Sequence, residues 1–113
     1  MEFSALSALS PLDGRYVRKT GALRPILSEA GFMRHRVKVE IAWLKALSKA
    51  GFAEVPPFSD ATNQFLDALV NDFVVDDAAR IKDIEAITNH DVKAVEYWIK
   101  EKVAHDEELA KAS

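Results

Sequence analysis

The 113-residue sequence contains no cysteine, which excludes disulfide scaffolds, thiolate metal sites and cysteine nucleophiles. Basic residues are also in the minority, because 15 Lys and Arg stand against 18 Asp and Glu. The resulting net charge of -3 has the wrong sign for a protein that holds a phosphate backbone by bulk electrostatics. We therefore expect no nucleic-acid partner.

Long hydrophobic runs are missing too. The longest uninterrupted apolar stretch is four residues, far short of the roughly 20 that a membrane-spanning helix needs. Glu2 stands where a secretory signal would carry basic residues, and no apolar signal segment follows it. We expect a cytoplasmic protein without a membrane partner.

Glycine and proline are scarce, with four of each, and all eight lie between Pro11 and Pro57. The second half is therefore free of helix breakers. A length of 113 residues fits one domain. We predict a single domain over 1–113, with an irregular arm at 1–19, helices at 20–55 and 58–104, and a polar tail at 105–113 that frays.

Apolar residues recur three and four positions apart, as one face of an α-helix requires. The spacing predicts an all-α protein of about five helices over 22–31, 32–50, 61–73, 76–88 and 91–103, with no strand. Gly31 and Gly51 are expected to stop the first two helices, and Ser59 or Asp60 to cap the third. The expected buried residues are Phe32, Val37, Val39, Ile41, Trp43, Leu44, Ala46, Leu47, Phe65, Leu69, Val70, Phe73, Ala78, Ile81, Ile84, Ala86, Ile87, Val92, Val95, Ile99 and Val103.

The arm contains the first candidate site, residues 10–16 with the sequence SPLDGRY. Proline followed by Asp-Gly is typical of a turn, in which Gly14 would accept a positive φ. Arg15 offers a planar fork of donors that matches phosphate or carboxylate, and Tyr16 adds a hydroxyl. Two interpretations remain open from these residues alone: an anion clamp, or a surface turn with Arg15 packed over Tyr16.

The second candidate site lies at a predicted junction between two helices, residues 88–93 with the sequence TNHDVK. Unpaired backbone N–H groups at the start of a helix attract anions, and the imidazole of His90 titrates near neutral pH. In the functional interpretation this helix start is an anion site, and Asp91 and Lys93 near His90 could shift the pKa of its imidazole in either direction. In the alternative, Asn89 or Asp91 only caps the helix and His90 only packs.

Other chemistry finds little support in the sequence. His35 and His105 are interpreted as structural, and no spacing of histidines or acids indicates a metal site. Glycine-rich phosphate loops and serine-elbow patterns are absent. We expect no metal and no cofactor. The aromatic residues predicted to lie in the core are Trp43, Phe65, Phe73, Tyr97 and Trp98.

Taken together, these segments resemble adenylosuccinate lyases of the bacterial type. The matching stretches are residues 10–16 (SPLDGRY), 36–44 (RVKVEIAWL), 79–82 (ARIK) and 88–97 (TNHDVKAVEY). The joint presence and order of the arm motif and the TNHDVKAVEY segment make the resemblance specific, and it covers nearly the whole chain.

The resemblance implies the N-terminal domain of an all-helical, homotetrameric enzyme of the fumarase and aspartase superfamily. That family cleaves adenylosuccinate to AMP and fumarate, and eliminates fumarate from the succinyl adduct of aminoimidazole carboxamide ribotide, both in purine biosynthesis. By the resemblance, Arg15 and Tyr16 contact the nucleotide substrate. Asn89, His90 and Asp91 likewise line the substrate pocket, with His90 near the phosphate or part of an acid network.

The sequence also departs from the family pattern. Family members are several times longer and carry a Thr-Ser pair, a catalytic histidine in a His-Gly-Gln context and a mobile serine-bearing loop, none of which occurs here. We therefore expect no catalytic acid or base in these residues, and an inactive chain when it is alone. Two alternatives stay open: a non-catalytic helical interaction module derived from the lyases, and a sister activity of the superfamily.

Overall fold

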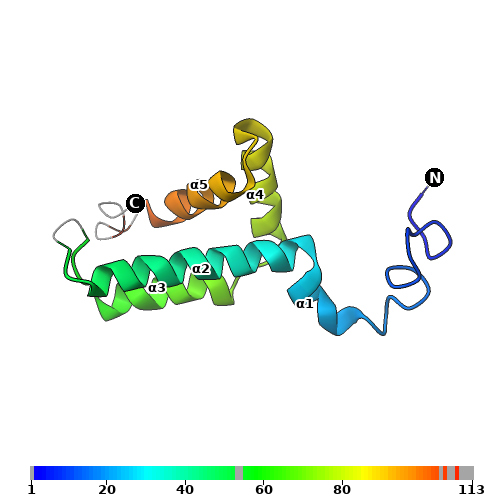
Figure 1. Cartoon of the computed structure of the whole chain (residues 1–113), viewed down its shortest axis with the longest axis horizontal. Helices are drawn as coiled ribbons and strands as arrows, with labels where there is room; N and C mark the ends of the chain where they lie inside the picture. Colours follow the sequence, from blue (N-terminus) through cyan, green and yellow to red (C-terminus); the bar gives the residue numbers. More distant parts are fainter. Residues whose placement is uncertain (1, 53–54, 105, 107–108, 110–113) are drawn as a thin grey trace. The chain divides into compact units, whose positions relative to one another are not determined.

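The computed structural model describes residues 2–52, 55–104, 106 and 109, and within them it contains helices and no strand (Figure 1). The elements in chain order are a short 3₁₀ helix η1 (Gly21–Leu23) and the α-helices α1 (Arg24–Leu27), α2 (Glu29–Lys49), α3 (Asp60–Asn71), α4 (Val75–Thr88) and α5 (Asp91–Val103). The predicted all-α class is confirmed. In the part of the chain that the structure describes, no helix is both long and apolar enough to cross a membrane.

The chain divides into two compact units, Met1–Phe32 and Met33–Ser113. The first unit holds the arm, η1, α1 and the first turn of α2, and the second holds the rest of α2 with α3, α4 and α5. The boundary between the two units, at residues 32 and 33, falls inside the predicted helical region 20–55. That residues 1–113 form one domain stays a prediction.

The junction between α1 and α2 differs from the sequence-based prediction, which placed a helix stop at Gly31. The chain turns at Ser28, whose backbone is extended with ψ 162°. The Ser28 hydroxyl oxygen then accepts a hydrogen bond from the Gly31 N–H at 3.0 Å, as an N-cap side chain does. Gly31 therefore lies inside α2, and the glycine that follows the end of this helix is Gly51, with φ 84°.

Within the second unit, α2 and α3 lie side by side and run in opposite directions (Figure 1). Two polar contacts join them. The Arg34 side chain donates from Nε to the carbonyl oxygen of Val70 at 2.9 Å, and Lys45 forms an ion pair with Asp67. The predicted cap of α3 is confirmed, because the Ser59 hydroxyl accepts from the Thr62 N–H at 3.3 Å.

Helices α4 and α5 are joined by a tight turn and pack against each other, with their axes at a wide angle (Figure 1). Asn89 makes the turn possible because it adopts the left-handed conformation, with φ 53° and ψ 28°. Away from the turn, Arg80 of α4 binds the Glu101 carboxylate of α5 through two nitrogens. Its Nε donates to Oε2 at 3.2 Å, and its Nη2 donates to Oε1. This paired guanidinium holds the pKa of the Glu101 carboxyl below its usual value.

The core of the second unit takes one stripe from each of its four helices. Much of the predicted face is confirmed, and the buried apolar residues are Met33, Val37 and Ile41 on α2; Leu66 and Val70 on α3; Ala78, Ile81 and Ile84 on α4; and Ala94, Val95, Trp98, Ile99 and Val103 on α5. The predicted positions that prove exposed on these helices are Val39, Trp43 and Ala46 on α2, Ala86 and Ile87 on α4, and Val92 on α5. Phe32, which belongs to the other unit, is exposed as well.

The buried face of α3 is rotated from the predicted one. Phe65 is 39% exposed, and the stripe that faces inward is Thr62, Leu66 and Val70. A threonine can begin this stripe because its hydroxyl is satisfied: it accepts from the Ser59 hydroxyl and donates to Asp106 Oδ2, both at 3.1 Å. The prediction chose Phe65, but the adjacent Leu66 is the residue that is fully buried.

Only some of the predicted core aromatics are inside. Trp98 is 1% exposed and meets Phe73 edge to face, with ring centroids 5.5 Å apart. Trp43, Phe65 and Tyr97 are instead exposed, by 61%, 39% and 44%. The expected fraying of the tail falls largely outside the described residues, among which Leu109 is buried.

Candidate functional site

The arm segment 10–16 folds into two successive turns held by its own backbone. The Gly14 N–H donates to the Ser10 carbonyl at 3.1 Å, and the Tyr16 N–H donates to the Pro11 carbonyl at 2.8 Å. Asp13 secures the first turn, because its Oδ1 accepts from the Ser10 N–H at 3.1 Å. The Asp13 carboxylate is therefore engaged in shaping the loop.

Gly14 is needed here for a different reason from the predicted one. The positive φ expected of it is not observed, since Gly51 is the glycine with positive φ among the described residues. Gly14 is instead buried, and a Cβ at this position would lie 2.7 Å from the carbonyl oxygen of Ala5. Its lack of a side chain lets the arm fold back on itself.

Arg15 and Tyr16 are both exposed, and each projects from this loop. The Arg15 guanidinium carbon lies 5.3 Å from the centroid of the Tyr16 ring, and Lys19 Nζ lies 6.0 Å from it. Two cations within about 6 Å of the centroid are within cation–π range of the ring. Arg15 is therefore packed over Tyr16, as expected of a surface turn. Because Arg15 is exposed, its guanidinium donors are also accessible to an anion, as an anion clamp requires.

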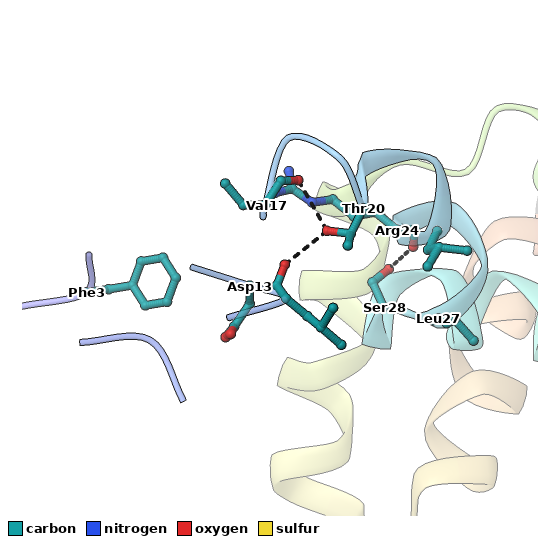
Figure 2. Close-up of a pocket in the computed structure, with 9 residues that line it drawn as sticks. Phe3, Asp13, Val17, Thr20, Arg24, Leu27 and Ser28 are labelled. Atoms are coloured by element: carbon teal, nitrogen blue, oxygen red, sulfur yellow. Dashed lines mark hydrogen bonds between the residues drawn. The ribbon is translucent and has the colours of Figure 1, made fainter. Parts of the chain in front are cut away.

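Two hollows adjoin this loop within the first unit. One, of about 390 Å³, is lined by Ser10, Pro11, Arg15 and Tyr16 together with alanines and leucines of the arm. The other, of about 460 Å³, is shown in Figure 2 and is lined by Phe3, Leu12, Asp13, Val17, Thr20, Leu23, Arg24, Leu27 and Ser28. The Thr20 hydroxyl lines this second hollow. It lies within hydrogen-bond distance of two carbonyl oxygens to which it can donate, those of Leu12 at 3.0 Å and Val17 at 3.2 Å. Of the two, only the first contains both predicted arm residues.

The second candidate segment occupies the turn between α4 and α5. Asn89 ends α4, with its N–H donating to the Glu85 carbonyl at 2.8 Å, and His90 is the residue that caps α5. The Thr88 hydroxyl spans the turn: it accepts from the His90 N–H at 3.3 Å and lies 3.2 Å from the His90 carbonyl. Asn89, His90 and Asp91 are all exposed, so the three predicted site residues face solvent.

The orientation of His90 follows from its role as a cap. Its Nδ1 accepts a hydrogen bond from the Lys93 N–H at 3.2 Å. A backbone N–H can only donate, so Nδ1 carries no proton and the neutral ring holds its proton on Nε2. The alternative in which Asn89 or Asp91 caps this helix and His90 merely packs is wrong for α5, because His90 is itself the cap and its side chain is 64% exposed. It presents an N–H donor at the beginning of α5, where the backbone is partly positive.

Asp91 is held by two partners. Its Oδ2 lies 2.8 Å from Nη1 of Arg36, and its Oδ1 accepts from the Val92 N–H at 2.8 Å. These bonds, the one from Arg36 foremost, hold the pKa of the Asp91 carboxyl below its ordinary value. Sequence reasoning missed Arg36 as part of this site, because the pair joins α2 to α5 and no local spacing reveals it.

The structure thus groups Asn89, His90, Asp91 and Arg36 in the second unit, and Arg15 with Tyr16 in the first. Of the two remaining histidines, His35 is exposed on α2, and His105 lies outside the described residues. Among the residues that the structure describes, no three His, Cys, Asp or Glu side chains gather to hold a metal ion.

Several curated proteins are similar to this chain over all or nearly all of its length. It is 58% identical over 114 residues to an adenylosuccinate lyase of Haemophilus influenzae, covering 100% of this chain and 25% of that protein. It is 60% and 56% identical over 110 residues to adenylosuccinate lyases of Vibrio cholerae and Escherichia coli, covering 96% of this chain and 24% of each. The chain therefore spans about a quarter of the length of these relatives. No family model matches it.

Proposed function

Since the chain is homologous over its whole length to part of the bacterial adenylosuccinate lyases, we propose that it is the N-terminal part of such a lyase. The complete enzyme would cleave adenylosuccinate to AMP and fumarate, and would release fumarate from the succinyl adduct of aminoimidazole carboxamide ribotide. In this proposal the chain binds substrate, and residues outside it carry the chemical step.

The observation that carries the proposal is the extent of the identity. At 56 to 60% over 96% or more of the chain, the similarity includes both candidate segments and not an isolated motif. Coverage of about a quarter of each relative explains why the sequence holds no Thr-Ser pair, no His-Gly-Gln context and no serine-bearing loop.

The candidate residues have the chemistry that a dianionic nucleotide and a succinyl group require. Arg15 supplies a planar fork for a phosphate or carboxylate, with Tyr16 beside it. His90 supplies an Nε2–H donor at a helix N-terminus, which suits a phosphate oxygen. Elimination beside a carboxylate also builds up negative charge, and fixed donors of this kind stabilise such a charge.

Exposed apolar side chains support the proposal that further protein covers this chain. Val39 and Trp43 lie one helical turn apart on α2 and are 66% and 61% exposed. In the proposed enzyme the remainder of the lyase buries such residues, and copies of the complete chain associate as a tetramer in the cytoplasm.

The first test is the intact mass of the endogenous protein that carries this sequence. A mass about four times that of the 12.6 kDa chain is expected. A mass of 12.6 kDa would contradict the proposal and favour the interaction module, in which Val39 and Trp43 bind a partner.

The second test measures fumarate release by the complete lyase and by variants of it. Arg15→Ala and His90→Ala are each expected to lower kcat/KM by about 10²–10³-fold, as loss of a donor to a charged transition state does. His35→Ala is the matched control, because His35 is an exposed histidine outside both segments. The 113-residue chain alone should release no fumarate above background. Wild-type kinetics in both site variants would refute the site assignment.

A further inference from the structure

Arg36 stands outside the candidate segments and yet reaches into one of them. It projects from α2, is about three-quarters buried, and places Nη1 2.8 Å from Oδ2 of Asp91, the first residue of α5. The adjacent residue, His90, is the cap whose imidazole faces solvent. The ion pair therefore ties the turn that bears His90 to a helix distant in sequence.

Few contacts hold the imidazole in place among the described residues. Its Nδ1 accepts from the Lys93 N–H at 3.2 Å and lies 4.0 Å from Asp91 Oδ1, and the side chain is 64% exposed. The position of the ring consequently depends on the position of the first turn of α5. On the α4 side, that turn follows Asn89, a residue in the left-handed conformation, and is bridged by the Thr88 hydroxyl. Arg36 supplies the anchor from α2.

We propose that Arg36 is a positioning residue for His90: by fixing Asp91 through their ion pair, it sets where the Nε2–H of His90 points. This inference rests on the proposed role of His90 in substrate binding. It extends that role by adding a residue that makes no contact with substrate itself. Misplacement of a binding group by about 1 Å can lower a rate by about 100-fold, so the loss of a remote anchor can matter to activity.

The same chain offers a matched control in Arg80. Arg80 also pairs with a carboxylate of α5, Glu101, but at the opposite end of that helix. Both pairs are partly exposed, so each contributes little to stability. Replacing either arginine by alanine removes one guanidinium–carboxylate pair from α5, and only one of the two pairs adjoins His90.

The inference is tested first in the 113-residue chain, independently of activity. In Arg36→Ala the NMR signals of the His90 ring should shift, and hydrogen exchange at the Lys93 N–H should become faster. Arg80→Ala should leave both unchanged. Unchanged His90 and Lys93 signals in Arg36→Ala would overturn the inference, whatever the complete enzyme does.

The complete lyase provides the second readout. Arg36→Ala is expected to lower kcat/KM by about 10–100-fold, while Arg80→Ala stays within about twofold of wild type at a similar Tm. Arg36→Lys should recover part of the loss, because it retains the charge but not the planar fork. Equal kcat/KM in Arg36→Ala and Arg80→Ala would overturn the inference. Wild-type kinetics in His90→Ala, with altered NMR signals in Arg36→Ala, would instead refute the proposed role of His90 and leave the positioning intact.

Discussion

Gly31, in the first turn of α2, packs directly against the backbone of Pro25 in α1. A Cβ on Gly31 would lie 2.7 Å from the Pro25 carbonyl carbon, closer still to its oxygen, and 3.0 Å from the Arg24 carbonyl oxygen. The two helices can therefore meet at Ser28 only if residue 31 has no side chain. Backbone atoms cannot move aside as the tip of a flexible side chain can.

Replacing Gly31 by alanine should destabilise the protein although alanine is the better helix former. Overpacking of this kind costs about 1–3 kcal/mol, which outweighs the gain of about 1 kcal/mol in helix propensity. Thermal unfolding followed by circular dichroism measures the change. Gly21→Ala is the control, because nothing lies within 4 Å of a Cβ there. Equal Tm values for the two variants would show that the close approach is absent.

Trp98 is expected to be the most sensitive core position. It is 1% exposed and packs edge to face on Phe73, so Trp98→Ala should cost about 3–5 kcal/mol of unfolding free energy. Its Nε1–H has no hydrogen-bond partner among the described residues, and burying such a donor costs roughly 1–3 kcal/mol.

Trp98→Phe should therefore be much milder than Trp98→Ala, because it keeps an aromatic ring and removes the unpaired donor. We expect a loss below about 2 kcal/mol, measured by urea unfolding followed by circular dichroism. Trp43→Phe, at an exposed position, should stay within about 0.5 kcal/mol of wild type. Equal losses in Trp98→Phe and Trp98→Ala would mean that shape, and not the aromatic ring, decides this site.

Helix boundaries were predictable from the sequence where residue type alone determines them. The end of one helix near residue 88 and the start of the next at Asp91 followed from a run of poor helix formers that includes Asn89. Gly31 was misread because its function is a close approach between two helices, which a local pattern cannot show. Phe65 was misplaced because the adjacent Leu66 faces inward in its stead. The inward position of Thr62 was not predictable, because its partner Asp106 is remote in sequence.

The candidate site was predictable to the same extent. Both segments were recognised by residue type and by resemblance, and both prove to be exposed non-helical turns or helix starts. The partner of Asp91 was not predicted. The helix that carries Arg36 is predicted from its apolar positions, and these say nothing about the partner of a charged residue. The contact between α2 and the start of α5 arises only in the tertiary structure.

The ion pair between Arg36 and Asp91 predicts a defined pH dependence. The pKa of Asp91 is lowered in the folded protein, first by the bond from Arg36. The pair therefore stabilises the fold above the unfolded carboxyl pKa of about 3.9, and this stabilisation is lost as the pH falls through the lower folded value. The Tm of Arg36→Ala should lie slightly below that of wild type at pH 7, because the pair is partly exposed, and the gap should narrow as Asp91 is protonated in acid. A gap that is as wide in acid as at pH 7 would contradict the assignment.

Asn89 separates backbone conformation from chemistry, because its left-handed backbone and its amide can be changed independently. Asn89→Ala forces a Cβ-bearing residue that lacks the amide into φ 53°, at a cost of about 1–2 kcal/mol. Asn89→Gly, which accepts this conformation freely, should preserve the Tm. If the amide contacts substrate in the complete lyase, Asn89→Gly lowers kcat/KM while the Tm stays at the wild-type value. If Asn89 serves only to end α4, Asn89→Gly keeps wild-type kinetics, and His90 and Asp91 alone remain as the substrate-binding residues of this turn.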